Sequence, residues 1–441
     1  MAQIKPFHGI RYNPDHVSSM ADVVSPPYDV ISENEQADLH DRSPHNVIRL
    51  ELGRRQTTDD DNDNPHTRAD RYLREWLQDG TLLREDVPAV YLTATEFEWA
   101  GKSYTRWGLL ASVRLEPFHQ GGIRPHEHTY SKIKSERLAL MRACRTNVSP
   151  IFSFFSDTRG TMSRLVSHAA GEAPVISFQD MHRHQQKMWI IRDAGLHDRI
   201  ARDFEEQTLY IADGHHRYET ALAYRDKLVA RGGYLPEDHP AHFTMMYLSS
   251  IQDPGLMILP AHRLLPKVAP ETRQMFFDKA RPFFKAKPLT KIDLAQGDAA
   301  ENLLAQLDRT PSGEALIVIP GARDTPVLLQ LLPDLKASLY PPETPAIMKD
   351  LDVTLLTEFV FPKLLGLAGN LLDDVGRVHY HHDAHTTVQG VLKERYEMAF
   401  IIKPPPITAV QQIAAAGHVM PRKSTYFAPK VITGLVMHAL E

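Results

Sequence analysis

The sequence predicts a mixed α/β fold built from more than one domain. Short apolar runs typical of strands alternate with segments whose apolar residues recur at helical spacing, and no repeat of fixed period is present. At 441 residues the chain is too long for one ordinary hydrophobic core. We expect an N-terminal α/β domain over residues 1–255 and a C-terminal α/β domain over residues 256–441. The two should pack together, with the loop at 420–430 returning to a site in the first domain.

The composition is that of a soluble globular protein, with 42% apolar and 24% charged residues. A net charge of −5 argues against a dedicated nucleic-acid binder, which is usually basic. The single cysteine, Cys144, excludes a disulfide framework within the chain and is expected to be a small buried residue. No run approaches the roughly 18 apolar residues of a membrane span, and the first residues carry no apolar signal region. We therefore expect a cytoplasmic protein.

The N-terminal elements begin after a Pro-Pro turn at residues 25–31, where two prolines forbid a helix. Ser32 and Glu35 form a capping-box pattern that opens a helix to about Arg42, and a second helical pattern ends at Gly80. Residues 100–102 are a hairpin turn between two strands, and a helix is expected over residues 132–145. The predicted strands of this half are 90–99, 104–115, 151–155, 175–178, 188–191, 209–212 and 243–248.

The C-terminal half repeats the alternation of strands and helices. Its predicted strands are 256–259, 316–319, 327–332, 378–381 and 398–402. Its predicted helices are 271–284, 302–307, 351–365 and 408–416.

The segment at 209–220 carries the strongest functional signal. A strand stops at Asp213 and Gly214, and His215, His216 and Arg217 follow at the start of a helical pattern. Free N–H groups and the dipole at a helix N-terminus favour an anion, and an arginine fork suits phosphate or carboxylate. Histidines carry protons near neutral pH or bind metal. An N-cap role for Asp213 explains only one of these residues.

Three other polar clusters stand beside apolar segments. Tyr28 and Asp29 follow the two rigid prolines, where the alternative is a plain turn with Asp29 as a local cap. Residues 124–129 place His126 and His128 on one side of an extended chain and Glu127 on the other, which suits a metal or a base, or else a surface loop. Residues 420–430 hold three cations and two prolines, which suits an anion-binding loop or a basic surface turn.

A fifth cluster is weaker. Histidines at 379, 381, 382 and 385 surround Asp383, and a half-exposed strand edge explains them better than a metal site. Common catalytic motifs are missing: the sequence has no Walker-type glycine loop, no Cys-x-x-Cys, no His-Glu-x-x-His and no Gly-x-Ser-x-Gly. Ordinary P-loop, zinc-protease and α/β-hydrolase interpretations therefore lose weight.

Several segments match, in order, a family of bacterial and archaeal proteins. They are Pro6-Phe7, Gly9-Ile10-Arg11-Tyr12, Ser25-Pro26-Pro27-Tyr28-Asp29-Val30, Asn46-Val47-Ile48-Arg49-Leu50, His126-Glu127-His128-Thr129, Ser149-Pro150-Ile151-Phe152, Asp213-Gly214-His215-His216-Arg217-Tyr218-Glu219-Thr220-Ala221, Pro260-Ala261-His262-Arg263 and residues 420–430. Over nearly its whole length the chain resembles domain-of-unknown-function family 1015. That resemblance implies no settled activity.

A shorter resemblance concerns mechanism. The segment from Gly214 to Arg217 after a strand is similar to the phosphate-binding box of the ParB/sulfiredoxin superfamily, which includes free-serine kinases. This resemblance implies a ParB/sulfiredoxin-like nucleotide-binding core. It also implies that Asp213 helps to hold Mg²⁺, that residues 214–217 cradle nucleotide phosphates, and that an upstream acid acts on the substrate hydroxyl.

Together these observations predict a nucleotide-dependent phosphotransferase that uses ATP or ADP with Mg²⁺ on a small hydroxylated metabolite, with serine as a candidate. Asp29 or Glu127 would orient the hydroxyl. The alternatives are a ParB-like nucleotide-switched regulatory or DNA-associated protein, and a metal-dependent hydrolase using His126, His128, His215 and His216. The expected catalytic residues are Asp213, His215, His216, Glu127 and Asp29, with Asp213 also as the metal ligand. The expected substrate- and phosphate-binding residues are Gly214, Arg217, Tyr28, His126, His128, Lys423, Ser424, Thr425 and Lys430.

Overall fold

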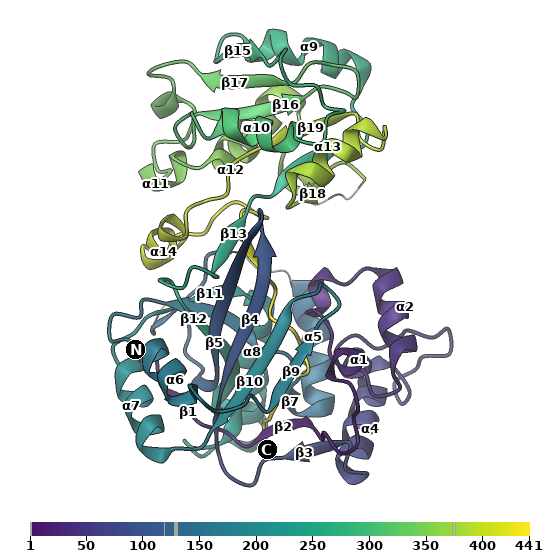
Figure 1. Ribbon diagram of the computed structural model, residues 1–441, viewed down its shortest axis with the longest axis vertical. Coiled ribbons are helices and arrows are strands. Elements are labelled where there is room, and N and C mark those ends of the chain that lie inside the picture. Colours follow the sequence, from purple (N-terminus) through teal and green to yellow (C-terminus); the bar gives the residue numbers. More distant parts are fainter. Residues whose placement is uncertain (1, 119, 128–130, 373, 375) are drawn as a thin grey trace. The chain divides into compact units, whose positions relative to one another are not determined.

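The computed structural model describes residues 2–118, 120–127, 131–372, 374 and 376–441. The chain divides into two compact units (Figure 1). Unit 1 comprises Met1–Met257 and Pro429–Glu441, and unit 2 comprises Ile258–Ala428. The first division lies two residues from the expected boundary at 255/256. The C-terminal strand β21 (Met437–Ala439) belongs to unit 1 because it pairs with two strands of that unit.

Unit 1 is built on a large mixed sheet, which has nine strands among the described residues. Its order is β6-β11-β8-β12-β5-β4-β10-β9, and β1 pairs with β5. Parallel pairing joins β6 to β11 and β8 to β12, and the other neighbours are antiparallel. The strands are β1 (Ile4–Lys5), β4 (Val90–Trp99), β5 (Lys102–Arg114), β6 (Ile123–Arg124), β8 (Ile151–Phe155), β9 (Ile176–Gln179), β10 (Gln185–Ile191), β11 (Leu209–Asp213) and β12 (Phe243–Ser250).

The longest strands form the expected hairpin. Both turn residues between β4 and β5, Ala100 and Gly101, have positive φ (49° and 72°), as tight hairpin turns require. The helices of unit 1 are α1 (Met20–Val23), α2 (Glu33–Arg42), α3 (Ile48–Glu51), α4 (Pro65–Gln78), α5 (Ser131–Cys144), α6 (Thr161–Ala169), α7 (Ala194–Phe204) and α8 (His215–Gly232), with short 3₁₀ turns η1 (Tyr28–Val30) and η2 (Pro240–His242). The Ser32–Glu35 capping box that opens α2 is present as expected.

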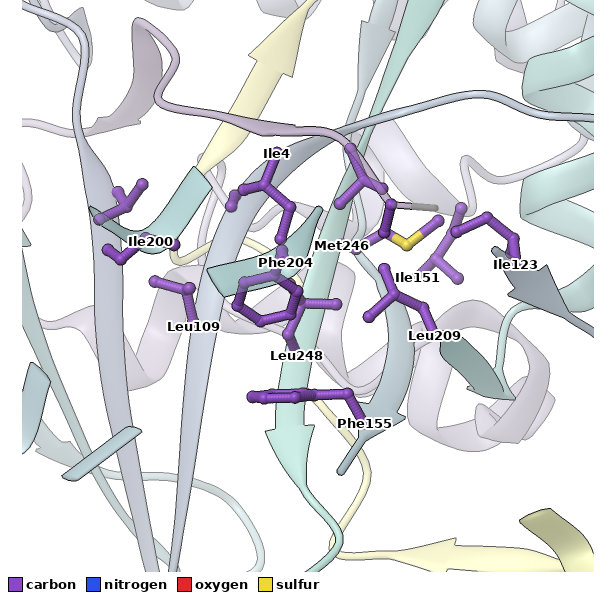
Figure 2. Close-up of a cluster of buried hydrophobic side chains, with 14 of the residues drawn as sticks. Ile4, Leu109, Ile123, Ile151, Phe155, Ile200, Phe204, Leu209, Met246 and Leu248 are labelled. Carbon is purple, nitrogen blue, oxygen red and sulfur yellow. The ribbon is translucent and has the colours of Figure 1, made fainter. Parts of the chain in front are cut away.

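The main core of unit 1 lies between the large sheet and helices α6, α7 and α8. Figure 2 shows Ile200 and Phe204 of α7 beside Leu109 and Leu248 of the sheet. Alternate strand residues supply this core, because successive side chains of a strand point to opposite faces of the sheet. The opposite face is therefore free to carry a different set of side chains, and the candidate site lies there.

A smaller sheet completes unit 1, in the order β3 (Leu82–Arg84), β2 (Gly9–Tyr12), β21 and β7 (Thr146–Asn147). Helix α4 buries Leu73 and Trp76 against it. Cys144 is free and buried in this second core, which confirms its predicted role as a small buried residue.

Unit 2 has its own sheet, in the order β15-β17-β16-β19-β14-β18 among the described residues. Its strands are β14 (His262–Leu265), β15 (Phe284–Pro288), β16 (Ala315–Ile319), β17 (Val327–Leu331), β18 (His379–His381) and β19 (Met398–Ile401), and a separate pair joins β13 (Met257–Leu259) to β20 (Tyr426–Ala428). Its helices are α9 (Pro270–Ala280), α10 (Ala299–Leu307), α11 (Ala346–Lys349), α12 (Asp352–Thr354), α13 (Ala384–Leu392) and α14 (Ile407–Ala415), with η3 (Lys336–Ser338), the π-helical η4 (Leu355–Leu365) and η5 (Gly369–Leu372).

The predicted mixed α/β architecture is confirmed, and two expected helices differ in detail. The helix expected over 271–284 ends at Ala280, and Phe284 begins strand β15. The helix expected over 351–365 begins as α12 and continues as the π-helix η4. Pro362 lies inside η4, where it cannot donate the hydrogen bond of a regular helix. None of the helices in the described ranges is long and apolar enough to cross a membrane.

Candidate functional site

The turn from β11 into α8 is the centre of the site. Gly214 is the N-cap of the 18-residue helix α8 and has φ +93°, a left-handed conformation that favours glycine. A Cβ atom at this position would lie 2.9 Å from Nε of Arg217, so the glycine also lets that side chain fold back over the turn. The expected strand, glycine turn and helix start are therefore present. Gly214, rather than Asp213, is the capping residue.

A β-bulge at the end of β11 aims Asp213 at the site. Ile211 pairs with Ser153 of β8, but Asp213 pairs with Phe152, so the register shifts by one residue between them. Without this shift Asp213 would share the face of Ile211, which points into the main core. The bulge instead turns the carboxylate to the opposite face of the sheet, where Phe152 lies. Bulges commonly re-aim a side chain in this way.

Two cations hold the Asp213 carboxylate. Its Oδ2 atom accepts a hydrogen bond from Arg217 at 3.1 Å and lies 3.5 Å from Nζ of Lys430. Burial alone would raise the pKa of Asp213, but Lys430 and Arg217 outweigh it and lower the pKa to about 2. Asp213 is therefore an ionised carboxylate in an electropositive setting at neutral pH.

Arg217 differs from the solvent-facing phosphate fork that its sequence position suggests. The residue is 8% exposed, and its guanidinium donates to the backbone carbonyl of Pro150 as well as to Asp213. Its Nε atom is buried without a hydrogen-bond partner among the described residues. Arg217 therefore positions Asp213 and contributes positive charge from the buried side of the turn. Its side chain lies there because side chains of a helix point back toward the N-terminus of that helix.

Two buried histidines flank the turn. His126 follows β6, and because β6 runs parallel to β11 the two strands end at the same edge. Nδ1 of His126 donates to the carbonyl oxygen of Ile211 at 2.8 Å, and its backbone N–H donates to Nε2 of His215 at 3.3 Å. Burial lowers the pKa of His126 to about 4 and that of His215 well below its ordinary value. Both rings are therefore neutral at pH 7. This environment differs from the sequence-based interpretation of His215 as a residue that carries a proton near neutral pH.

The short turn η1 brings Tyr28 and Asp29 to the same site. The Tyr28 ring lies 4.1 Å from the guanidinium carbon of Arg137 and 6.0 Å from that of Arg217, both within cation–π range. Arg137 is held in turn by Glu51, whose carboxylate lies 3.1 Å away and also accepts a hydrogen bond from Ser149 at 3.0 Å. Burial, reinforced by Asp29, raises the pKa of Tyr28 to about 12, so its hydroxyl is neutral.

Asp29 and Asp213 have opposite pKa shifts. Asp29 keeps contact with solvent, but the protein atoms crowded around its carboxyl group raise its pKa, and the charge of Asp213 raises it further. Arg217 and Lys430 counteract part of this rise at Asp29, but they lower the pKa of Asp213 outright. The site therefore contains one carboxylate held in its ionised form and a second with increased proton affinity.

Arg106 fixes the chain next to Lys430. This β5 arginine is 1% exposed, donates from Nε to the Tyr247 hydroxyl at 3.1 Å and donates to the carbonyl oxygen of Pro429. Its guanidinium carbon also lies 4.9 Å from the centre of the Phe152 ring. Arg106 thus anchors the residue immediately before Lys430 on the face of the sheet to which Asp213 is turned.

The remaining predicted site residues have mixed placements. Glu127 follows His126 and His216 follows His215, and both are half-buried. His128 lies outside the described residues. Lys423, Ser424 and Thr425 belong to unit 2, where the Lys423 carbonyl accepts a hydrogen bond from Arg263 at 3.0 Å and the buried Ser424 hydroxyl donates to the carbonyl of Pro421. Three of the four polar clusters therefore supply residues to one site in unit 1. The fourth cluster, residues 420–430, contributes Lys430 to it.

Within the described ranges, no group of three or more His, Cys, Asp or Glu side chains could hold a metal ion. This applies to the pair His126 and His215: Nε2 of His215 accepts a hydrogen bond from the His126 backbone N–H, and Nδ1 of His126 donates to the Ile211 carbonyl. It applies equally to the histidines of β18, two of which pack on Tyr396.

Three residues of the site were not predicted as such: Arg106, Arg137 and Glu51. Each is a charged side chain at the edge of, or within, an apolar stretch of sequence: Arg106 in a strand, and Glu51 directly after Ile48 and Leu50. A lone charged residue at a position that strand or helix periodicity assigns to the interior could have indicated these site residues, because a buried charge needs a partner.

Residues 4–354 match the family model described as a protein of unknown function, DUF1015, and the chain belongs to this family. No curated protein sequence matches the chain.

Several solved structures show a distant similarity. A free serine kinase variant in complex with AMP matches with 11% identity and a TM-score of 0.35, covering 71% of this chain and 89% of the kinase. A conserved hypothetical protein from Pyrococcus furiosus matches with 11% identity and a TM-score of 0.33, covering 71% and 92%. C-terminally truncated SbnI from Staphylococcus aureus matches with 10% identity and a TM-score of 0.34, covering 74% and 85%.

Proposed function

We propose that unit 1 is a nucleotide-dependent phosphotransferase that acts on a small hydroxylated metabolite. The observation that carries this proposal is the split pair of carboxylates, Asp29 with a raised pKa and Asp213 with a pKa of about 2, at the N-terminus of α8. Two carboxylates whose surroundings separate their pKa values are the usual arrangement for distinct roles in one reaction. Phosphoryl transfer needs such roles together with concentrated positive charge.

In this proposal the start of α8 binds the nucleotide phosphates. Backbone N–H groups at the first turn of a helix and the helix dipole both favour an anion. Lys430 adds a cation 3.5 Å from Asp213, and Arg217 adds a second from below the turn. The resemblance of the Gly214–Arg217 segment to a nucleotide phosphate box supports the same assignment.

Asp29 is the residue assigned to the substrate hydroxyl. It keeps contact with solvent, and its raised proton affinity suits a group that accepts a hydroxyl proton. Tyr28, held between Arg137 and Arg217, fixes the turn that carries Asp29. Glu127 is the second candidate for this role, since it follows His126 at the same edge of the sheet.

Mg²⁺ fits the site only when it is bound together with the nucleotide phosphates. The ion is usually held by one or two carboxylates together with phosphate oxygens, and Asp213 and Asp29 are the carboxylates available here. Bound in that way, Mg²⁺ would neutralise phosphate charge. The protein's own part is to hold Asp213 ionised, to place Lys430 and to orient the hydroxyl through Asp29.

The test is a product assay on the full chain. Purified protein is incubated with ATP or ADP, Mg²⁺ and a panel of hydroxylated metabolites that begins with serine, and phosphorylated products are detected by ³¹P NMR and mass spectrometry. We expect one phosphorylated product that disappears in Asp213→Asn and persists in Asp86→Asn, a control at an exposed carboxylate of the same unit. A complete absence of product, together with duplex-DNA binding that weakens steeply with salt, would favour the nucleotide-switched DNA-associated alternative.

A further inference from the structure

A second cavity in unit 1 has the features of a ligand site. Its volume is about 690 Å³, within the range of small-molecule pockets. It lies among α4, α5 and the C-terminal half of α8, and it shares no lining residue with the site around Asp213. Nothing in the proposed phosphotransfer uses it.

Three cations that line the cavity have no ion-pair partner among the described residues. Arg142 of α5 and Lys227 and Arg231 of α8 are exposed, and none of them forms an ion pair with another described residue. The Glu441 side-chain carboxylate in the lining lies 2.6 Å from Arg145 and is already paired. Three positive charges that line the cavity are therefore unpaired within the described part of the chain.

Part of the cavity wall is apolar and carries one hydroxyl. Tyr224 is 5% exposed, and Leu228 and Leu440 lie beside it in the lining. The Tyr224 hydroxyl makes no hydrogen bond to any described residue and remains accessible at the cavity, where it can donate to a ligand. Burial raises its pKa, so the group is a neutral donor.

We propose that this cavity binds a small anion that carries a phosphate group next to a ring or other apolar portion. The three unpaired cations would hold the phosphate, since clustered Lys and Arg are the side chains that bind dianions. Tyr224 would donate a hydrogen bond, and its ring with Leu228 and Leu440 would contact the apolar portion. The substrate class is thus a phosphorylated aromatic or heterocyclic metabolite, bound separately from the Asp213 site.

Phenyl phosphate is the probe, because it joins a dianionic phosphate to a ring. Binding is measured by calorimetry to wild-type protein, to a Lys227→Gln/Arg231→Gln variant, and to a matched Lys102→Gln/Arg199→Gln control whose cations are exposed elsewhere in unit 1. We expect the cavity variant to bind at least tenfold more weakly and the control to bind like wild type. Inorganic phosphate should bind more weakly than phenyl phosphate, because it lacks the ring.

Hydrogen exchange on the wild-type protein locates the bound probe without relying on any variant. We expect phenyl phosphate to protect backbone amides of residues 139–145 and 224–231. Protection confined to the turn around Asp213, equal loss in the cavity variant and the control, or no binding at millimolar probe would each overturn the proposal. None of these outcomes bears on the phosphotransfer assay, which depends on different residues.

Discussion

Nζ of Lys430 lies 3.5 Å from Oδ2 of Asp213, which joins a residue near the C-terminus to the end of strand β11 of the same unit. The contact depends on a bulge that turns Asp213 out of the core, and on Arg106, which holds the carbonyl of Pro429. It keeps the Asp213 carboxylate ionised at neutral pH and leaves its neighbour, Asp29, with the higher proton affinity.

Replacement of Lys430 by methionine should weaken nucleotide binding. The change removes a charge-assisted contact, which contributes roughly 1.5–3 kcal/mol, so the dissociation constant for ATP should rise by about 10- to 100-fold. Calorimetric titration measures the effect. Lys102→Met, at the exposed first residue of β5, is the matched control and should bind as the wild type does. Equal affinities for the two variants would exclude Lys430 from the nucleotide site.

Gly214→Ala should be more destabilising than Gly160→Ala. Both glycines are left-handed N-caps, at φ +93° and +66°, so each alanine pays a conformational cost of about 1–2 kcal/mol. Only at Gly214 does the added Cβ meet another group, 2.9 Å away on Arg217, whereas nothing lies within 4 Å at Gly160. Urea unfolding of the two variants measures the difference. If Gly160→Ala costs as much as Gly214→Ala, Arg217 is not packed on the turn.

His126 should make the protein less stable as the pH falls. Its pKa is about 4 in the folded protein and 6.5 in the unfolded chain, so below pH 6.5 the unfolded state takes up the proton first. Stability is therefore complete above pH 6.5 and falls between pH 6.5 and 4, by an amount on the order of 3 kcal/mol. Free energies of unfolding at pH 7.5 and 4.5 should differ less in His126→Asn than in the wild type. His168→Asn, on the exposed side of α6, should keep the wild-type difference, and a His126 variant that also keeps it would show that the ring is protonated in the fold.

Arg106→Lys should weaken nucleotide binding although the substituted residue touches no phosphate. Lysine keeps the charge but cannot reach both the Tyr247 hydroxyl and the Pro429 carbonyl as the guanidinium does. Lys430 would then lose its fixed position, and the variant should resemble Lys430→Met in ATP affinity. In the double variant the two losses should not add, because both act through one contact. Fully additive losses would mean that Arg106 acts independently of Lys430.

The amino-acid sequence predicts the parts of this site better than their roles. The strand, glycine turn and helix at 209–220 follow from local patterns, and so does the grouping of Tyr28–Asp29 and His126 as polar residues beside apolar segments. The bulge before Asp213 could not be predicted, because it exists only in the pairing of β11 with β8. The neutral state of His215 depends on burial and on His126, and the residues next to His215 in the sequence indicate neither of them.

Arg217 is another residue whose role cannot be predicted from the local sequence. Its position in the motif suggests a phosphate ligand, whereas its side chain is turned back to Pro150 and Asp213 by the helix geometry and by the space that Gly214 leaves. The role of Arg106 cannot be predicted from the sequence, because this residue lies in a strand far from every motif and its partner Pro429 is 323 positions away. Local sequence patterns cannot indicate contacts over such separations.

The kinetics of Asp29→Asn test the central claim most directly. Asparagine has nearly the same shape but accepts no proton, so phosphotransfer should lose 100-fold or more in kcat while the dissociation constant for ATP changes by less than about threefold. Asp86→Asn, assayed with the same donor and metabolite, should match the wild type. A wild-type kcat in Asp29→Asn would contradict the assignment of the proton-accepting role to this split pair of carboxylates.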